Sequence, residues 1–228
     1  MKRYIPLLAL LLASQLYPQS KMDINNLIDR GGLLYAPNKE KPFSGSVFDL
    51  YDNGQKKLNG RYRNGIKNGK WKWWSEDGKM DSSGTYKIGI KDGKWIHFTD
   101  IGNGKYEVKY TKGNIDLVTF TDNLGQTYSG IPVNEELKAD GQYLYQEHEY
   151  NFSKYPEAFA TIKNGELDGL VTRWHENGQK KWEATLKDGK PDGLLTRWYE
   201  NGQKEFEETY KDGAIISSKC WDWDGNEM

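Results

Sequence analysis

A repeat of 24 residues constrains the fold of this chain more than any other feature of its sequence. Glycine occurs at residues 45, 69, 93, 169 and 193, again nine residues later in each unit, and a third time eleven residues after that. Fifteen of the 25 glycines fall on this pattern. A period between about 20 and 50 residues is typical of stacked units, each of which buries its apolar face only against its neighbours. We therefore expect a repeat protein.

Two turn signals in each unit indicate that the units are β-hairpins. Asn-Gly or Asp-Gly pairs occur first at 53–54, 77–78, 177–178 and 201–202, and then at 64–65, 188–189 and 212–213. These pairs favour two-residue turns, because Gly and Asn tolerate the positive φ that such turns require. Gly178→Val should therefore destabilise the chain, whereas Lys180→Ala should change the free energy of unfolding by no more than about 0.5 kcal/mol. A short helical piece is expected only at 134–139.

Apolar residues at fixed places in the repeat predict the core. The first column comprises Val47, Trp71, Trp95, Val171 and Leu195, and the second comprises Leu50, Trp74, Phe98, Trp174 and Trp198. The third comprises Leu58, Ser82, Tyr106, Trp182 and Phe206, and the fourth comprises Tyr62, Tyr86, Tyr110, Leu186 and Tyr210. The first two columns lie three residues apart, which breaks the two-residue period of a strand. This step predicts a bend or bulge in the first strand of each unit.

The expected fold is all-β, an elongated antiparallel stack of about seven β-hairpin repeats with degenerate middle units. Residues 21–44 form an N-terminal segment, and residues 45–116 carry regular hairpin repeats. The pattern degrades over 117–164, where Leu117 replaces a glycine and insertions occur. Regular repeats and a C-terminal cap follow over 165–228.

The first 20 residues have the pattern of a secretory signal peptide. Lys2 and Arg3 precede a short apolar run from residue 5 to residue 13. This run is shorter than the roughly 20 residues that a membrane-spanning helix requires. The alternative is a hydrophobic N-terminal helix packed on the domain. We expect export to the periplasm, the envelope or the extracellular space.

Strings of residues at the first turn resemble a known family. They read Tyr-Asp-Asn-Gly-Gln-Lys at 51–56, His-Glu-Asn-Gly-Gln-Lys at 175–180 and Tyr-Glu-Asn-Gly-Gln-Lys at 199–204. With the strands at 69–74 and 193–198, they resemble the MORN repeat variant of the YwqK-like antitoxin family, over about residues 30–116 and 155–228. The resemblance implies an antiparallel hairpin stack and an antitoxin role in a toxin–antitoxin pair. It brings no catalytic residues.

No arrangement of residues in the sequence predicts catalysis, a metal site or a cofactor. His97, His148 and His175 lie far apart, and the single Cys220 has no second thiol for a disulfide or a zinc site. We interpret Cys220 as a small buried hydrophobic residue. The 32 Lys and Arg residues balance 33 Asp and Glu residues, so nucleic acid is not an expected partner.

Two features remain as candidate binding surfaces. Between residues 53 and 75 there are seven basic side chains and no acid, interleaved with Tyr and Trp; six of them are candidates, namely Lys56, Lys57, Arg61, Arg63, Lys70 and Lys72. The alternative is a solvated pair of strands whose acids lie on neighbouring units. The second feature is the column Trp73, His97, Arg173 and Arg197, since Trp and Arg are common binding anchors. The column could equally keep the sheet soluble. A partner protein is expected, or alternatively an envelope glycan or an anionic lipid surface.

Export can be tested directly. The positive start and the short apolar run predict that the mature protein lacks its first residues. N-terminal sequencing of the protein from an envelope fraction should give a sequence that begins beyond the apolar run. An intact Met1 on protein recovered from the cytoplasm would contradict this prediction.

Overall fold

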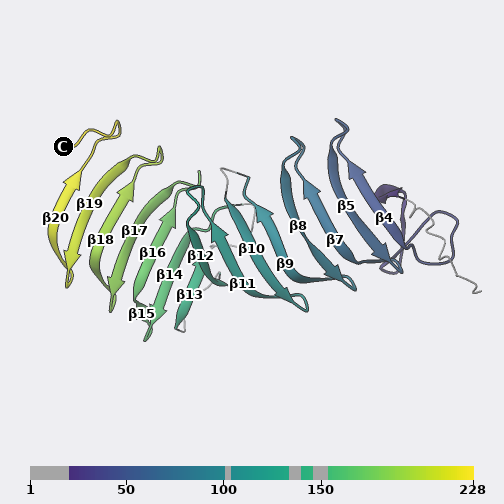
Figure 1. The fold of residues 1–228 in the computed structure, drawn as a ribbon, viewed down its shortest axis with the longest axis horizontal. Helices are drawn as coiled ribbons and strands as arrows, with labels where there is room; N and C mark the ends of the chain where they lie inside the picture. Colours follow the sequence, from purple (N-terminus) through teal and green to yellow (C-terminus); the bar gives the residue numbers. More distant parts are fainter. Residues whose placement is uncertain (1–20, 101–103, 134–139, 146–153) are drawn as a thin grey trace, which may run out of the picture.

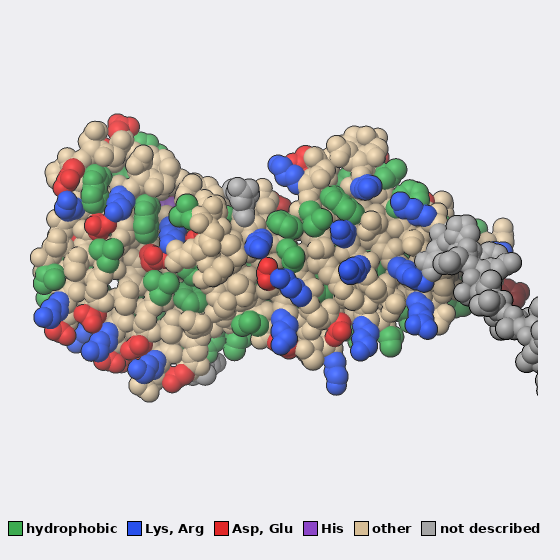
Figure 2. Space-filling view, in the orientation of Figure 1, with side chains coloured by type: hydrophobic (Ala, Val, Ile, Leu, Met, Phe, Trp, Pro, Cys, Tyr) green, Lys and Arg blue, Asp and Glu red, His purple; other side chains and the backbone are tan. Residues whose placement is uncertain are grey.

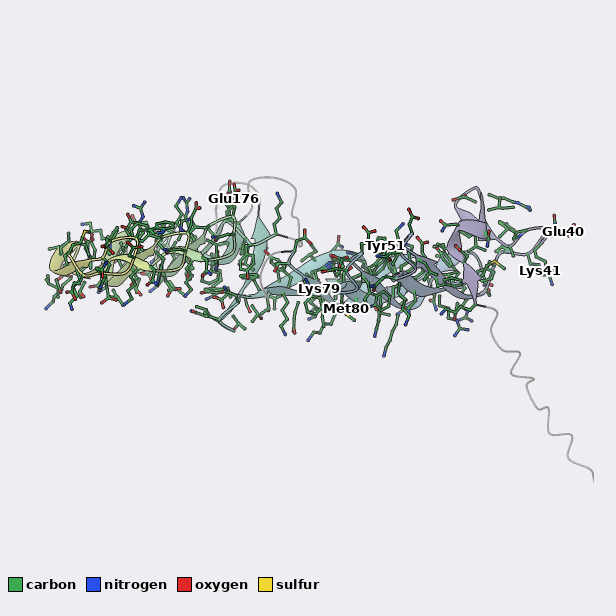
Figure 3. The ribbon with its side chains drawn as sticks, turned by 90° about the horizontal axis from the view of Figure 1, so that it is seen from above. Glu40, Lys41, Tyr51, Lys79, Met80 and Glu176 are labelled. Atoms are coloured by element: carbon green, nitrogen blue, oxygen red, sulfur yellow. The ribbon has the colours of Figure 1, made fainter. Side chains whose placement is uncertain are left out.

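The computed structural model describes residues 21–100, 104–133, 140–145 and 154–228. The signal peptide expected over 1–20 and the helical piece expected at 134–139 lie outside these residues. The described chain is nearly all β, as predicted, and forms an elongated sheet (Figure 1). Seen from above, this sheet is one layer thick over most of its length, with side chains on both faces (Figure 3).

One sheet contains 18 strands, and a separate two-stranded sheet lies before it. The first half of the large sheet comprises β1 (Met22–Asp23), β4 (Gly45–Leu50), β5 (Lys56–Arg63), β6 (Ile66–Lys67), β7 (Gly69–Trp74), β8 (Met80–Lys87), β9 (Ile90–Phe98), β10 (Lys105–Thr111), β11 (Asn114–Thr121) and β12 (Thr127–Val133). The second half comprises β13 (Gly141–Tyr145), β14 (Ala158–Lys163), β15 (Glu166–Leu167), β16 (Gly169–Trp174), β17 (Lys180–Lys187), β18 (Lys190–Trp198), β19 (Lys204–Lys211) and β20 (Ala214–Cys220). The small sheet comprises β2 (Ile28–Arg30) and β3 (Leu33–Tyr35).

The N-terminal segment covers one end of the array. A 3-10 helix (Ile24–Asn26) follows β1, and Met22, Leu27 and Leu34 pack against the core residues of the first hairpin. The Asn25 side chain donates a hydrogen bond of 2.9 Å to Asp49 on β4. Figure 3 shows Glu40 and Lys41 at this end of the molecule, away from β20.

Neighbouring strands pair antiparallel, as expected, with two exceptions. β1 pairs parallel with β4, and β12 pairs parallel with β13. The second parallel pair lies in the region where the glycine pattern degrades. Leu117 stands where other units have the first glycine of the repeat. The equivalent Gly69 and Gly93 have φ values of 76° and 69°. A leucine does not adopt such a conformation readily. The register of β11 with β10 shifts beside Leu117, and β11 then continues to its pairing with β12.

The parallel junction transfers the repeat from one face of the sheet to the other. Residues paired across strands project to the same face. Trp95 pairs with Val108, which pairs with Val118 and then with Gly130 on β12. We call this face the tryptophan face.

The first-column residues of the second half lie on the other side. Ile131, which follows Gly130 and therefore points away from the tryptophan face, pairs with Tyr143 on β13. Tyr143 in turn pairs with Ala160 on β14, and Ala158, two residues earlier on the same face, pairs with Arg173. Val171 and Arg173 therefore project from the second face, which we call the arginine face.

Contacts on the tryptophan face agree with this assignment. The Tyr128 ring lies 5.4 Å from the Phe159 ring, and its hydroxyl group lies 3.4 Å from Glu183 Oε2. Phe159 pairs with Thr172, which pairs with Glu183. Tyr128, Phe159, Thr172 and Glu183 thus share one face, opposite to Arg173.

The predicted break in the first strand is confirmed on β4, β7, β16 and β18 but not on β9, which pairs with β10 without a register shift. The strand register shifts between Asp49 and Leu50, and again at the equivalent places on β7, β16 and β18. The core prediction is confirmed for four of the five residues of the first column, since Val47, Trp71, Trp95 and Val171 are buried and Leu195 is partly buried. It is wrong for Leu50, which is 45% exposed because it follows the bulge at the edge of the first hairpin.

The two turns of each unit have different geometries. At the second turn, Asn64 and Gly65 have φ values of 51° and 76°, as a two-residue turn requires. The prediction is wrong for the first turn, where Gly54 has a φ of 81° and Asn53 is not among the residues with positive φ. The Gly54 amide donates to the Tyr51 carbonyl oxygen and the Tyr51 amide donates to the Gln55 carbonyl oxygen, which forms a type I turn closed by a glycine bulge.

The string of residues at the first turn connects one unit to the next. The Asn53 side-chain amide donates to the Glu76 carbonyl oxygen at 3.0 Å, and the Tyr51 hydroxyl donates to the Trp74 carbonyl oxygen at 2.7 Å. The same bonds recur with a 23- or 22-residue offset at Asn177, Asn201 and Tyr199, and His175 Nε2 lies 2.9 Å from the Trp198 carbonyl oxygen. The residues at 51–56, 175–180 and 199–204, which carry the family resemblance, therefore have a structural role.

Tryptophan rings in the first half of the sheet lie flat on glycine. A Cβ atom added at Gly60 would overlap the indole ring of Trp71, and one added at Gly84 would overlap that of Trp95. The equivalent residues of the second half are smaller. There, Ala184 pairs with Val171 on one side and with Leu195 on the other. Large residues therefore pair with Gly, and medium-sized residues pair with Ala.

This complementarity predicts the effect of Gly84→Ala. Alanine normally stabilises a strand relative to glycine, but here the methyl group would displace Trp95, and we expect a loss of about 1–3 kcal/mol in the free energy of unfolding. In a Trp95→Leu background, which reproduces the Ala184–Leu195 arrangement, Gly84→Ala should no longer destabilise. Urea unfolding of the four proteins measures the coupling. Equal losses in both backgrounds would contradict this account.

Candidate functional site

The strand pairings separate the column of four predicted binding residues. Trp73 lies two residues from Trp71 on β7 and pairs with Ser82, which pairs with His97, so both Trp73 and His97 belong to the tryptophan face. Arg173 and Arg197 project from the arginine face. The prediction of one continuous column is therefore wrong, because the parallel junction turns the second half of the repeat over.

The basic stretch of the first half lies mainly on the arginine face. Lys72 pairs with Asn59 and alternates with Trp71 and Trp73, so it points away from the tryptophan face. The same alternation places Lys70, Arg61 and Arg63 beside it, and all four side chains are exposed. The structure thus brings the basic stretch and the two arginines of the second half onto one face, which the sequence analysis did not predict.

These basic side chains lack acidic neighbours. Among the described residues, no carboxylate oxygen lies within 4.0 Å of the charged groups of Arg61, Arg63, Lys70 or Lys72, nor of that of Lys56 at the edge of the bulge. The alternative in which acids of neighbouring units compensate the stretch is therefore not favoured for these five residues.

Lys57 differs from the other members of the basic stretch. Its Nζ lies 3.1 Å from Asp49 Oδ2. Burial alone would raise the pKa of Asp49, but its hydrogen bonds with Lys57 and Asn25 lower that pKa below the usual value. Lys57 therefore stabilises the bulge of the first hairpin and is not a free binding residue.

Charge is distributed unequally along the array. Residues 41–112 contain 15 Lys and Arg and 8 Asp and Glu, whereas residues 154–228 contain 11 and 15. The formal charges are thus +7 and −4, although the whole chain is near neutral. Figure 2 shows Lys and Arg gathered over β4–β10 with few acids between them, while both signs alternate over β16–β20. The chain is therefore nearly neutral as a whole, but residues 41–112 are basic and residues 154–228 are acidic.

Arginine and aromatic side chains alternate in a row on the second half of the arginine face. Arg173 pairs with Trp182, which pairs with Arg197, which pairs with Phe206. Arg197 forms an ion pair of 2.8 Å with Glu205, and its guanidinium lies 6.0 Å from the centre of the Phe206 ring. A shallow groove is lined by Lys181, Trp182, Leu195, Arg197 and Phe206. Arg and aromatic residues in a groove are typical of protein-binding anchors.

The tryptophan face of the first half carries a layer of parallel rings. Trp73 lies 5.6 Å from Trp71 at an interplanar angle of 24°, and 5.7 Å from Trp95 at 30°. Trp71 and Trp95 are almost fully buried, whereas the Trp73 ring, which contacts both, is partly exposed and has Lys67 Nζ 5.9 Å from its centre. His97 stacks on Trp95 at 5.9 Å. Burial, assisted by the charge of Lys91, lowers the pKa of His97 to about 4, so this imidazole is neutral at pH 7.

Two lysines on this face, Lys67 from the basic stretch and Lys91, were not among the predicted binding residues. Lys67 Nζ lies 4.9 Å from the centre of the Trp71 ring and 5.1 Å from that of Tyr86. Lys91 Nζ, one unit later, lies 4.3 Å from the centre of the Trp95 ring. Burial lowers the pKa of Lys67, and burial together with the charge of Lys67 lowers that of Lys91. Their spacing of 24 residues was a signal that could have revealed them.

A partly buried polar cluster joins β12 and the turn before it to β17 and is structural. Lys180 Nζ lies 2.7 Å from both Glu183 Oε2 and Gln126 Oε1, and Glu183 also accepts a hydrogen bond from Thr172. Burial is the main reason that the pKa of Tyr128 is raised. An equivalent ion pair forms between Lys204 and Glu207 one unit later. A pair that recurs with the repeat supports the fold and does not single out a catalytic centre.

Neither a metal site nor a membrane-spanning helix is found in the part of the chain that the structure describes. It contains no group of three or more His, Cys, Asp or Glu side chains placed to hold a metal ion. Its helices include none with the length and apolar character needed to cross a membrane. Cys220 is exposed on β20, so its interpretation as a buried residue is wrong.

Comparison with known families identifies repeats within the chain. The model of the MORN repeat variant matches residues 67–87, 167–188 and 191–212. These segments contain β7–β8, β16–β17 and β18–β19, which are regular hairpins of the array. No curated protein matches the chain.

The partly buried polar cluster corrects the expectation for Lys180→Ala. The Lys180 side chain is only 10% exposed, and its removal would leave the Glu183 carboxylate without a cation in a partly buried site. We expect a loss of about 1–3 kcal/mol in the free energy of unfolding. Lys181→Ala, at the neighbouring exposed residue, should remain within about 0.5 kcal/mol. Equal urea midpoints for the two variants would contradict a structural role for the cluster.

Proposed function

We propose that this protein is a non-catalytic repeat scaffold that binds a partner protein through the arginine face. The observation that carries the proposal is the convergence of two basic features on that face. Arg61, Lys70 and Lys72 in the first half and Arg173 and Arg197 in the second half project from the same side of one sheet.

The chemistry of this face indicates the kind of partner. In the first half of the sheet, exposed basic side chains without acidic neighbours favour an acidic surface and increase its rate of association. The Trp182 and Phe206 rings beside Arg197 offer apolar anchors of the type that contributes most binding energy in protein interfaces. An elongated partner could contact both halves at once. Each contact would then add to the total affinity.

The family resemblance supports a more specific form of the proposal. A YwqK-like antitoxin would bind its toxin as a partner protein, and no step of catalysis is required. The signal-peptide pattern of residues 1–20 supports an exported protein, for which an immunity factor of the envelope is the corresponding role. An enzyme is not favoured, because the repeated residues supply similar groups at every unit and do not converge on one reactive centre.

Partner capture by matched variants tests the proposal. Arg173→Ala combined with Arg197→Ala should reduce the amount of partner that cross-links to the chain in an envelope fraction by about tenfold or more, without a change in melting temperature. Lys187→Ala combined with Lys211→Ala removes two exposed lysines from the ends of β17 and β19 and serves as the control. Raised salt should weaken capture by the wild-type protein. Equal capture by both double variants would contradict binding through the arginine face.

A further inference from the structure

The tryptophan face of the first three hairpins has two features that the proposed protein partner does not use. One is the partly exposed ring of Trp73, which is held nearly parallel to the buried rings of Trp71 and Trp95. The other is the pair of half-buried ammonium groups of Lys67 and Lys91. Both features lie on the side of the sheet opposite to Lys70 and Lys72.

Partial burial of the two ammonium groups costs desolvation free energy, which an anionic ligand would offset. Aromatic rings surround both of them, and Lys91 also donates a hydrogen bond of 3.3 Å to the Tyr110 hydroxyl group. In the described chain neither Nζ has a carboxylate within 4.0 Å. Asp49, on the same face, is already held by Lys57 and Asn25. Partly desolvated cations without counter-charges favour binding of anions at this surface.

The Trp73 ring and the one-unit spacing of Lys67 and Lys91 indicate the shape of the ligand. The Trp73 ring runs within 30° of the two rings that lie flat on the sheet, so its outer surface is suited to stacking with a flat apolar group. Equivalent residues of successive units lie about 10 Å apart, because each unit contributes two strands. Alternate residues of an extended β-1,4-linked glycan are turned over, so its substituents face one side once per disaccharide. That repeat is comparable to the spacing of about 10 Å that strand geometry gives for equivalent residues such as Lys67 and Lys91.

We propose that the tryptophan face binds an acidic β-1,4-linked polysaccharide, with a sugar ring stacked on Trp73 and uronate carboxylates at Lys67 and Lys91. The stacked ring supplies affinity for the sugar, and the two lysines select a charged chain over a neutral one. This surface is independent of the arginine face. The protein could therefore hold a glycan on one side and a partner protein on the other.

Calorimetric titration with two matched oligosaccharides tests this inference. A β-1,4-linked mannuronate octamer carries a carboxylate on each ring, and a β-1,4-linked mannose octamer is its neutral counterpart. The wild-type chain should bind the mannuronate octamer at least about tenfold more tightly than the mannose octamer. Lys67→Gln combined with Lys91→Gln should abolish this preference. Trp73→Ala should weaken the binding of both octamers, by about tenfold.

Matched controls separate specific binding from general effects. Lys70→Gln combined with Lys72→Gln removes the same charge from the opposite face and should leave the preference unchanged. Trp73→His reproduces the residue found at His97 and retains a stacked ring, so it should fold normally and bind more weakly than wild type. An equal effect of the two lysine pairs, no binding of either octamer, or binding only to vesicles that contain phosphatidylglycerol would each overturn the proposal. None of these results bears on capture through the arginine face.

Discussion

A single-layer sheet has to bury its large side chains on its own surface, and this constraint organises the whole molecule. No second layer covers most of the sheet (Figure 3), yet Trp71 and Trp95 are only 1% exposed. They achieve this by lying flat on Gly60 and Gly84, under rings and lysine stems from neighbouring strands. The residues that cover a given tryptophan belong largely to adjacent units, so a single hairpin could not form this core.

The same constraint explains why the repeat strings are conserved from unit to unit within the chain. The Asn and Tyr side chains of the first turn donate to carbonyl oxygens of the next turn, which fixes the distance between units. In the next unit, Ser75 and Asp77 take the places of Tyr51 and Asn53. The Asp77 carboxylate has no N–H group that could donate to the following turn. A hollow lined by Asp77, Phe98 and Asp100 lies where this link is missing. The connection between turns is therefore a property of particular side chains and not of the backbone alone.

The parallel pair β12–β13 gives the molecule two chemically different faces. Had the glycine repeat continued through Leu117, the same columns would have stayed on one side, and the tryptophan column would have continued into the arginine column. Instead, the basic stretch of the first half shares a face with the arginines of the second half. The stacked rings of Trp73 and His97 face the other way. The two proposed binding surfaces both depend on this exchange.

The sequence alone determined the hairpin units and the bulge in most of their first strands. These features depend on local chemistry: glycine at positive φ, the Asn-Gly turns and the two-residue alternation of strands. It also marked the basic stretch and the Arg and Trp column as candidate surfaces. What only the tertiary structure decided is which of these residues share a face. That depends on the direction and register of one strand pair, and a shift of one residue moves every side chain to the other side of the sheet. Lys67, Lys91 and Lys180 are ordinary charged residues in the sequence, and their burial follows from long-range contacts with rings and polar groups on other strands.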